Sequence, residues 1–440
     1  MAMKVAILFS GGKDSTFTVY HCMKKGYDIK CLVAMVPENP ESFMFHHPNA
    51  RLAEVLAKSM DIPVIMQNTK GKKGSEIADM RKAISRIRQD VDGVVAGGLA
   101  SKYQADRIAR VCQSLGLKFI APLWNIEPGK YWKMLIKAGF EVMIVSVSAE
   151  GLGKEWLGRT VDEQAFRQLK ALSKKFSFHL GFEGGEAETL VLDAPMFKSR
   201  MYVTDAEKEW DGDAGKYIVK DFMLIDKKQL SALMASYHKR KAKIKQRLDD
   251  FRKVLSGSEW DVFAELCFCL CTPQSQAVKC NRAINQLVSS RLLFKGNWET
   301  IAKVLHSKGV RFHNQKARYI VRAMNLLTVK GIMSPKRRID KVDVLKTREW
   351  LVENIKGMGY KEASHYLRNI GLGWDIAILD RHILKNLNRL GVIGSLPKPL
   401  TKKKYLEIEN RMRIFSKSSQ IPFDELDLLF WSEETGHVFK

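Results

Sequence analysis

The chain has 440 residues, a formal net charge of +25, 45% apolar residues and seven cysteines. This length predicts two or three domains, each large enough to bury a core of its own. No apolar run approaches the length of a membrane span and no cleavable leader is visible, so we expect an intracellular, cytoplasmic protein and exclude a membrane or secreted one.

Charge is distributed unevenly along the chain. Residues 1–227 carry 33 Lys and Arg against 28 Asp and Glu, whereas residues 228–440 carry 40 against 20. This asymmetry predicts a polyanion such as nucleic acid as the partner of the second half, although solvated helix faces also carry many Lys and Arg.

The first 145 residues alternate short β-branched runs with amphipathic stretches, which predicts a parallel sheet covered by helices on both faces. The expected strands are residues 5–9, 30–36, 63–66, 93–96 and 141–146, and the expected helices are residues 17–25, 50–60, 75–90 and 102–115. From about 149 to 227 the pattern becomes mixed, with two further strands expected at 189–192 and 217–224. We interpret this stretch as a substrate-facing subdomain of a first domain that covers residues 1–227.

From residue 228 to 440 the pattern is almost purely helical, so a second, all-α domain is expected there. Its basic stretch at residues 239–247 is interpreted as a helix start or a linker. Helices are expected at residues 260–271, 278–290, 299–305, 314–328, 342–354, 361–370, 381–390, 402–415 and 423–432.

The first candidate site is the loop Ser10-Gly11-Gly12-Lys13-Asp14-Ser15, which follows the first expected strand. A glycine-containing loop between a strand and a helix exposes backbone N–H groups that bind an anion, and the helix N-terminus adds partial positive charge. Ser10 and Ser15 can donate hydroxyl hydrogen bonds, and Asp14 can help to hold Mg2+. The spacing Gly-x-x-x-x-Gly-Lys-Ser/Thr is absent, which argues against an ATPase that cleaves the γ-phosphate.

Ser-Gly-Gly-x-Asp-Ser resembles the signature of the PP-loop ATP pyrophosphatases. The segment from Glu183 to Phe197, with Glu186, Glu188 and Thr189, resembles the hallmark segment of the diphthine–ammonia ligases within that family. The resemblance implies an ATP-dependent amidation, in which the diphthine carboxylate on elongation factor 2 becomes an acyl-adenylate and ammonia displaces AMP. It implies ATP with Mg2+ as cofactor and elongation factor 2 and ammonium as partners.

The three glutamates of this segment have two possible roles. Glu183, Glu186 and Glu188 can face the quaternary ammonium of the substrate or a bound ammonium ion, or they can cap turns and pair with lysines. Two alternatives for the whole domain are a non-catalytic ATP-binding module and a tRNA-modifying PP-loop enzyme. The latter would require a catalytic cysteine pair, and Cys22, Cys31 and Cys112 show no such pattern.

The second candidate site begins at Gly357-Met358-Gly359, between two expected helices. The backbone N–H groups of such a hairpin bind a DNA phosphate without reading sequence. Lys361 opens the next helix and is a candidate nucleophile for C1′ of a sugar. Asp380 is expected at the N-terminus of another helix, where its carboxylate can stabilise an oxocarbenium-like sugar. The alternative, without a catalytic role, is that Lys361 is a surface lysine and Asp380 caps a helix.

This arrangement resembles the helix-hairpin-helix DNA glycosylases, and most closely the archaeal-type 8-oxoguanine DNA glycosylase/AP lyases. Segments starting at Glu265 and Arg311, and the stretch from Leu428 to Lys440, carry the resemblance. It implies excision of 8-oxoguanine from double-stranded DNA and β-elimination through a lysine Schiff base, without a cofactor. It assigns Lys440 to discrimination of the base, Trp431 to stacking on it and Gln274 to probing the space that it leaves.

The cysteines of the second half reduce the number of functions that are possible for it. Cys267, Cys269 and Cys271 alternate without metal-ligand spacing and are expected to be buried thiols on an apolar helix. No cysteine follows Cys280, so the four-cysteine iron–sulfur site of endonuclease III-type enzymes is missing. The sequence therefore predicts a bifunctional enzyme, an amide ligase fused to a DNA repair glycosylase. Excision of another base and a non-catalytic DNA-binding module are the alternatives for the second half.

Overall fold

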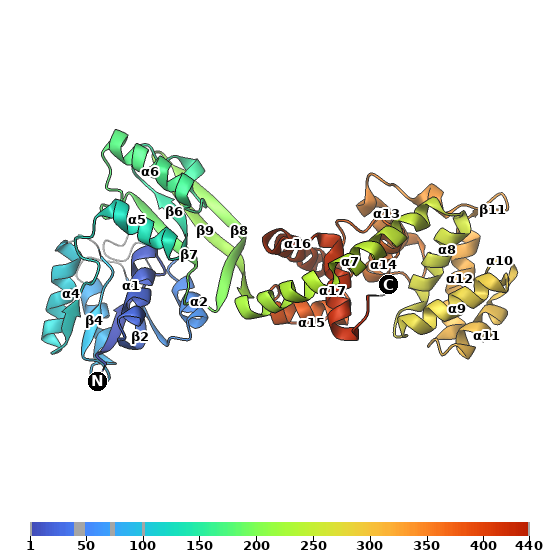
Figure 1. Ribbon diagram of the computed structural model, residues 1–440, viewed down its shortest axis with the longest axis horizontal. Coiled ribbons are helices and arrows are strands. Elements are labelled where there is room, and N and C mark those ends of the chain that lie inside the picture. The colour runs from blue at the N-terminus through green and yellow to red at the C-terminus, as the bar shows by residue number, and fades with distance from the viewer. Residues whose placement is uncertain (1, 39–48, 71–74, 99–101, 439–440) are drawn as a thin grey trace. The chain divides into compact units, whose positions relative to one another are not determined.

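The computed structural model describes residues 2–38, 49–70, 75–98 and 102–438, without the side chain of Tyr103. The chain divides into two compact units, Met1–Lys227 and Lys228–Lys440. Their elements can be followed in Figure 1.

The first unit contains the expected parallel sheet. Its strand order is β3-β2-β1-β4-β5, and every pair is parallel. The strands are β1 (Lys4–Leu8), β2 (Asp28–Pro37), β3 (Val64–Thr69), β4 (Gly93–Val95) and β5 (Lys118–Ile120). The sequence did not predict β5, because its three residues Lys118-Phe119-Ile120 lack the β-branched run that marks β4.

Both faces of this sheet are buried, as a parallel sheet requires. Val5 and Ile7 of β1 join one apolar cluster and Ala6 joins the other, because neighbouring strand residues point to opposite faces. Helices α1 (Lys13–Lys24) and α2 (Leu52–Ser59) contribute to the first cluster, and α3 (Ser75–Ser85) and α4 (Lys102–Ser114) contribute to the second.

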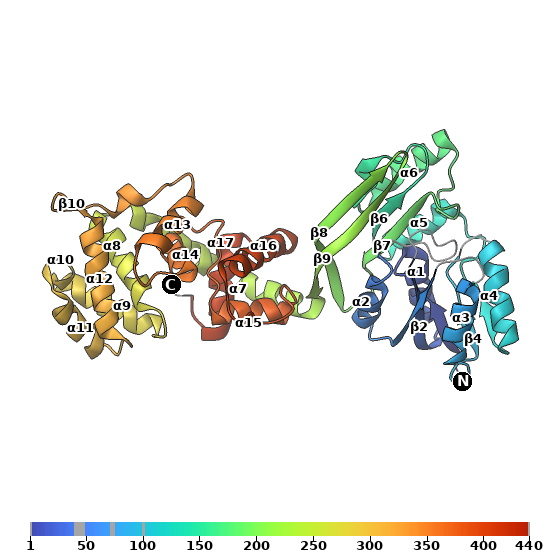
Figure 2. The same ribbon diagram turned by 180° about the vertical axis from the view of Figure 1, so that it is seen from behind.

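The expectation that residues 141–146 belong to the parallel sheet is wrong. Strand β6 (Glu141–Val147) pairs antiparallel with β7 (Ala187–Asp193) and β9 (Ala214–Asp226) in a second sheet of order β7-β6-β9-β8. An apolar, β-branched run predicts a strand but not its partner, which is chosen by tertiary packing. The long strand β8 (Ser199–Asp211), visible beside β9 in Figure 2, and the helices α5 (Pro128–Lys137) and α6 (Glu163–Phe176) were not predicted.

The second unit is helical, as expected. Its first helix is α7 (Lys227–Ser256). The helices that follow are α8 (Glu259–Cys271), α9 (Ala277–Ser289), α10 (Leu292–Lys295), α11 (Trp298–Ser307), α12 (His313–Leu327), α13 (Val344–Asn354), α14 (Tyr360–Asn369), α15 (Arg381–Leu390), α16 (Lys402–Ser419) and α17 (Phe423–Thr435). The series of helices is interrupted between α12 and α13 by two short strands and a 3-10 turn. These are β10 (Thr328–Val329), β11 (Ile332–Met333) and η2 (Pro335–Arg338).

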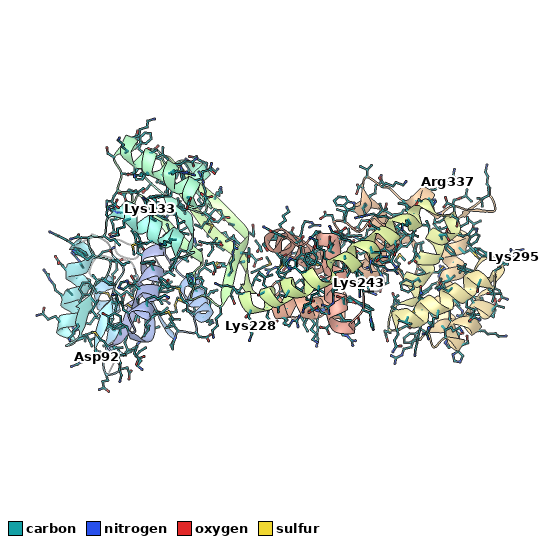
Figure 3. All side chains as sticks on the ribbon, viewed as in Figure 1. Asp92, Lys133, Lys228, Lys243, Lys295 and Arg337 are labelled. Atoms are coloured by element: carbon teal, nitrogen blue, oxygen red, sulfur yellow. The ribbon has the colours of Figure 1, made fainter. Side chains whose placement is uncertain are left out.

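The basic stretch 239–247 is neither a helix start nor a linker, because it lies inside α7 (Lys227–Ser256). Tyr237, Ile244 and Leu248 are buried and continue the apolar stripe of α7 through the stretch, so tertiary packing holds it helical. Exposed basic side chains lie on several elements of this unit, among them Lys243 on α7, Lys295 on α10 and Arg337 in η2 (Figure 3).

All seven cysteines are free and buried, and Cys267, Cys269 and Cys271 lie on α8 as expected. Within the described ranges, no group of three or more His, Cys, Asp or Glu side chains could hold a metal ion. No helix among the same residues is long and apolar enough to cross a membrane.

Candidate active sites

The loop of residues 10–15 connects β1 to α1 and is shaped by its two glycines. Gly11 has a φ of +82°, and a Cβ at this position would lie 2.9 Å from Leu56 Cδ1. Gly12 is the N-cap residue of α1. The hydroxyls of Ser10 and Ser15 lie 3.2 Å apart, and Ser10 Oγ accepts a hydrogen bond from the backbone N–H of Gly12. Hydroxyls and amides thus converge at the N-terminus of a helix, which suits an anion.

The loop is fastened to β7, which carries the second motif of this unit. The backbone N–H of Val191 donates to the carbonyl of Gly11 at 3.0 Å, and the backbone N–H of Lys13 donates to Thr189 Oγ1 at 3.1 Å. The structure therefore brings together two motifs that lie about 175 residues apart in the sequence. Thr189, predicted to contact substrate, supports the loop.

Lys13 is buried and satisfied inside the protein. Its ammonium donates to the carbonyl of Gly181 at 2.7 Å and to Asp14 Oδ2 at 2.8 Å, and it lies 5.4 Å from the ring centre of Phe182. Lys13 is not one of the described residues that line the adjoining cavity. Its contacts favour a role in holding the loop and Asp14 in place.

A cavity of about 940 Å³ opens beside the loop. It lies at the carboxyl ends of β1 and β4, where the strand order reverses and where open α/β sheets bind ligands. Gly97, which follows β4, allows close approach there, since a Cβ would lie 2.6 Å from the carbonyl oxygen of Asp14. The lining includes the side chains Ser10, Asp14, Ser15, Gln104, Trp124, Phe182, Glu183, Glu188, Glu209, Trp210, Asp211 and Lys216.

The three motif glutamates separate into two groups. Glu183 and Glu188 line the cavity. Glu186 instead accepts hydrogen bonds from the backbone N–H groups of His179 and Gly184, so it stabilises the turn before β7. Burial raises the pKa of Glu188 to about 8, with Lys13 opposing and Asp14 reinforcing this shift. Glu188 is therefore a carboxyl group that takes up and releases a proton near neutral pH.

Asp14 fits the expected role in holding Mg2+. Its Oδ1 is buried without a hydrogen-bond partner while Oδ2 binds Lys13, and the side chain lines the cavity. A carboxylate oxygen is the ligand type that Mg2+ prefers. The cysteines of this unit do not suit nucleophilic chemistry, because burial raises the pKa of Cys22, Cys31 and Cys112 to about 11.

In the second unit, α13 and α14 form the predicted hairpin. Gly357 has a φ of +90°, and a Cβ there would lie 2.2 Å from Tyr319 Cδ2, so only glycine fits this position. Gly359 is the N-cap residue of α14, and its backbone N–H donates to Glu362 Oε2 at 3.3 Å. A cavity of about 510 Å³ beside the hairpin is lined by residues 352–358 together with Tyr319 and Arg322.

Lys361 and Asp380 line one cavity of about 950 Å³ in this unit. Lys361 lies in the first turn of α14, with Nζ 3.3 Å from Glu362 Oε1. Asp380 is the N-cap of α15 and accepts a 2.8 Å hydrogen bond from the backbone N–H of Ile383 through Oδ1. Capping fixes the orientation of the Asp380 carboxylate.

Gln274 and Trp431 line the same cavity, whereas Lys440 lies outside the described residues. Gln274 has a φ of +55°, a conformation that costs free energy in a residue with a side chain. The turn around it is held by the buried Lys316, whose ammonium donates to the carbonyls of Cys271 and Pro273, both at 2.7 Å, and to Ser275 Oγ at 3.0 Å. Burial lowers the pKa of Lys316.

Several polar residues of this cavity were not predicted as site residues, among them His365, Arg368 and Asp427. His365 and Arg368 follow Lys361 at positions i+4 and i+7, so all three lie on one face of α14 and line the cavity. Arg368 Nη1 lies 3.3 Å from Asp427 Oδ2, and both side chains are buried. Burial raises the pKa of Asp427, and Arg368 opposes this. The helical spacing from Lys361 could have identified His365 and Arg368 in the sequence, whereas no sequence signal identifies Asp427.

The sequence matches three family profiles. Residues 3–119 match the diphthamide synthase N-terminal domain, and residues 127–225 match the diphthamide synthase C-terminal domain. Residues 244–421 match the profile described as 8-oxoguanine DNA glycosylase.

Several curated proteins are similar to one half of the chain. An 8-oxoguanine DNA glycosylase/AP lyase of Fusobacterium nucleatum is 45% identical over 206 residues, which cover 46% of this chain and 94% of that protein. A human diphthine–ammonia ligase is 31% identical over 226 residues, which cover 47% of this chain and 84% of that protein. The diphthine–ammonia ligase of Schizosaccharomyces pombe is 34% identical over 223 residues, but this chain spans only 37% of its length.

Proposed function

Since the chain belongs to the diphthine–ammonia ligase family in its first half and to the 8-oxoguanine DNA glycosylase/AP lyase family in its second, we propose that it is a bifunctional enzyme. The halves correspond to two domains, residues 1–227 and 228–440, each with its own active site. For the second half, the observation that carries the proposal is that one cavity is lined by Lys361, Asp380 and Trp431. For the first half, the observation that carries the proposal is the contact between β7 and the loop of residues 10–15, which we call the phosphate loop.

In the glycosylase half, DNA is bound along its phosphates, and Gly357 and Gly359 present backbone N–H groups to one of them. The damaged nucleotide is extruded from the duplex into the cavity of about 950 Å³. There Trp431 stacks on 8-oxoguanine, and Gln274 and Lys440 contribute to its selection.

The chemical steps use Lys361 and Asp380. Lys361 Nζ forms a bond to C1′ while the bond from C1′ to the base breaks; the base leaves with the electron pair of that bond and takes up the proton that Nζ loses. The Asp380 carboxylate stabilises positive charge on the sugar as this occurs. Opening of the sugar ring gives a Schiff base, loss of a C2′ proton follows, and the 3′ phosphate leaves in the β-elimination.

The test of this half is base excision from three kinds of duplex, which contain 8-oxoguanine, uracil, or an adenine mispaired with guanine. We expect strand cleavage at 8-oxoguanine and at neither of the other bases. Cleavage at uracil or mismatched adenine with none at 8-oxoguanine would overturn the assignment of the substrate.

In the ligase half, the substrate carboxylate attacks the α-phosphorus of ATP and pyrophosphate leaves. Ser10, Gly11, Gly12 and Ser15 hold the phosphates at the N-terminus of α1. Asp14 would hold Mg2+, which neutralises phosphate charge when it is bound. Ammonia then attacks the acyl carbon of the adenylate, AMP leaves, and the amide is formed.

Glu188 provides the base that this second step requires. Ammonium has no lone pair, so it must lose a proton before it can attack the acyl carbon. Burial gives Glu188 a pKa of about 8, which makes its carboxylate a stronger base than an exposed glutamate. Glu183 lines the same cavity and supports the binding of the cation.

The test of this half is the formation of AMP and pyrophosphate from ATP in the presence of ammonium and elongation factor 2 bearing diphthine. We expect both products in equal amounts, together with amidated factor. A chain that binds ATP and forms neither product would be the non-catalytic ATP-binding module.

A further inference from the structure

The hairpin of β8 and β9 supplies part of the wall of the ligase cavity. Residues 209–211 and 214–216 line the cavity on either side of a two-residue turn that begins at Gly212, which has a φ of +57°. The hairpin tip therefore belongs to the same site as the phosphate loop, and its side chains have no part in the chemistry described above.

Trp210 is held at this tip by a specific cross-strand contact. It pairs with Gly215 in the β8–β9 ladder, and a Cβ on Gly215 would lie 2.4 Å from Trp210 Cε3 and 2.8 Å from Leu157 Cδ1. The missing side chain of Gly215 thus makes the space that the indole occupies. Trp210 is still 37% exposed, so a large aromatic surface is fixed in position and remains accessible to a ligand.

The charges of the cavity point to a cationic ligand group. Five acidic side chains line it, from Asp14, Glu183, Glu188, Glu209 and Asp211, and Lys216 is the one lining lysine or arginine among the described residues. Lys13 pairs with Asp14 and Glu188 takes up a proton near neutral pH, which leaves three acidic side chains against Lys216. ATP and a substrate carboxylate are both anionic, so this excess of negative charge opposes them unless a cation binds as well. Glu209 and Asp211 precede and follow Trp210 in β8, so their side chains point to the other face of the hairpin and act on a cation at the indole through their charge alone.

We propose that the indole of Trp210 recognises the quaternary ammonium group of the diphthine side chain, with Glu209 and Asp211 adding negative charge at the same hairpin tip, an inference that rests on the ligase function proposed above. A trimethylated nitrogen has no N–H to donate, so hydrogen bonds cannot select it. Aromatic faces and carboxylates attract such a cation, and a preorganised indole is the strongest aromatic partner. The hairpin tip then selects the methylated substrate and leaves Glu188 to the ammonium ion.

The experiment compares elongation factor 2 that carries trimethylated diphthine with the same factor carrying the unmethylated primary amine. We expect the wild-type chain to prefer the trimethylated form in kcat/KM for AMP formation. Trp210→Ala should lower kcat/KM for that form by about ten-fold, mainly through KM, and Trp210→Phe should retain most of the preference. Trp374→Ala is the matched control, because Trp374 is an exposed tryptophan in the other unit.

Two further measurements keep the outcomes separate. The affinity of Trp210→Ala for ATP should equal that of the wild type, which shows that the cavity is still folded. A preference for the trimethylated factor that is unchanged in Trp210→Ala and in Glu209→Gln/Asp211→Asn would overturn the inference.

If the wild-type chain forms no AMP, the same comparison is made by binding both factor forms in the presence of a non-hydrolysable ATP analogue. Equal affinities would refute the recognition site, and unequal affinities lost in Trp210→Ala would support it although the ligase function had failed.

Discussion

The backbone N–H of Lys13 donates a 3.1 Å hydrogen bond to Thr189 Oγ1, and this contact joins the phosphate loop to β7, the strand that carries Glu188. Both residues are buried. The proposed binding of ATP in the first unit therefore depends on a residue of β7 that lines none of the cavity described above.

Replacement of Thr189 by valine should loosen the phosphate loop. The substitution keeps the shape of the side chain but removes the acceptor, which leaves a buried N–H unpaired at a cost of about 1–3 kcal/mol. We expect the affinity for ATP, measured by calorimetry, to fall by about five-fold or more. Thr189→Ser keeps the hydroxyl and should bind ATP like the wild type, and a Thr189→Val chain with unchanged affinity would contradict the role of this contact.

Lys361→Gln should abolish trapping of the chain on 8-oxoguanine DNA by borohydride, because the amide cannot form a Schiff base. Lys303→Gln is the control, since Lys303 is exposed and lies outside the lining of the cavity. Robust trapping by Lys361→Gln would exclude Lys361 as the nucleophile.

Asp380→Asn should separate catalysis from folding. Asparagine is as good an N-cap as aspartate, so the thermal stability of the helical unit should change little. Loss of the negative charge should slow single-turnover base excision by about 100-fold, since the charge of the sugar is no longer stabilised. Unimpaired excision by this variant would reduce Asp380 to its capping role.

Glu188 should make stability and activity depend on pH in opposite directions. Because its pKa is about 8 in the folded chain, the folded state binds the proton more tightly than the unfolded state does. Its contribution to the free energy of unfolding is therefore full below the ordinary carboxyl pKa and is lost as the pH rises through about 8. Amidation should instead rise as the pH approaches 8 and the base ionises. Glu188→Gln should remove both dependences, as judged by melting temperature without ATP and by AMP formation; if both profiles persist, another group is responsible.

Lys316→Met should damage selection of the base more than cleavage of the strand. The variant leaves the carbonyls of Cys271 and Pro273 without their donor, so the turn that carries Gln274 should relax. We expect excision of 8-oxoguanine to slow by about ten-fold, whereas cleavage at a preformed abasic site should stay near the wild-type rate, because it needs Lys361 but no base recognition. Equal losses in both assays would indicate general unfolding instead.

The sequence predicted the elements that carry local signals. The glycine loop at residues 10–15, the hairpin at Gly357 and the helix that begins after Asp380 each depend on residues close together in the chain, and the family resemblance built on them is confirmed. The fold class, a parallel α/β domain and an all-α domain, is confirmed as well.

Features that arise from pairing between distant segments could not be predicted. The placement of β6 in an antiparallel sheet depends on β7 and β9, and no local pattern specifies that choice. Glu186 and Glu188 lie two residues apart, yet only the turn before β7 decides that one caps backbone amides and the other lines the cavity. The contact between Trp210 and Gly215 likewise follows from the register of the β8–β9 hairpin.

The burial of all seven thiols bears on the conditions under which this enzyme works. Guanine is oxidised where peroxide and related oxidants accumulate, and these oxidants attack accessible cysteine thiolates first. Burial raises the pKa of Cys280, near the Lys316 turn, to about 11, and Cys267 and Cys271 are shifted upward by the same cause. These thiols stay protonated and buried, so the helical unit exposes no reactive thiolate to the oxidants that form 8-oxoguanine, its proposed substrate.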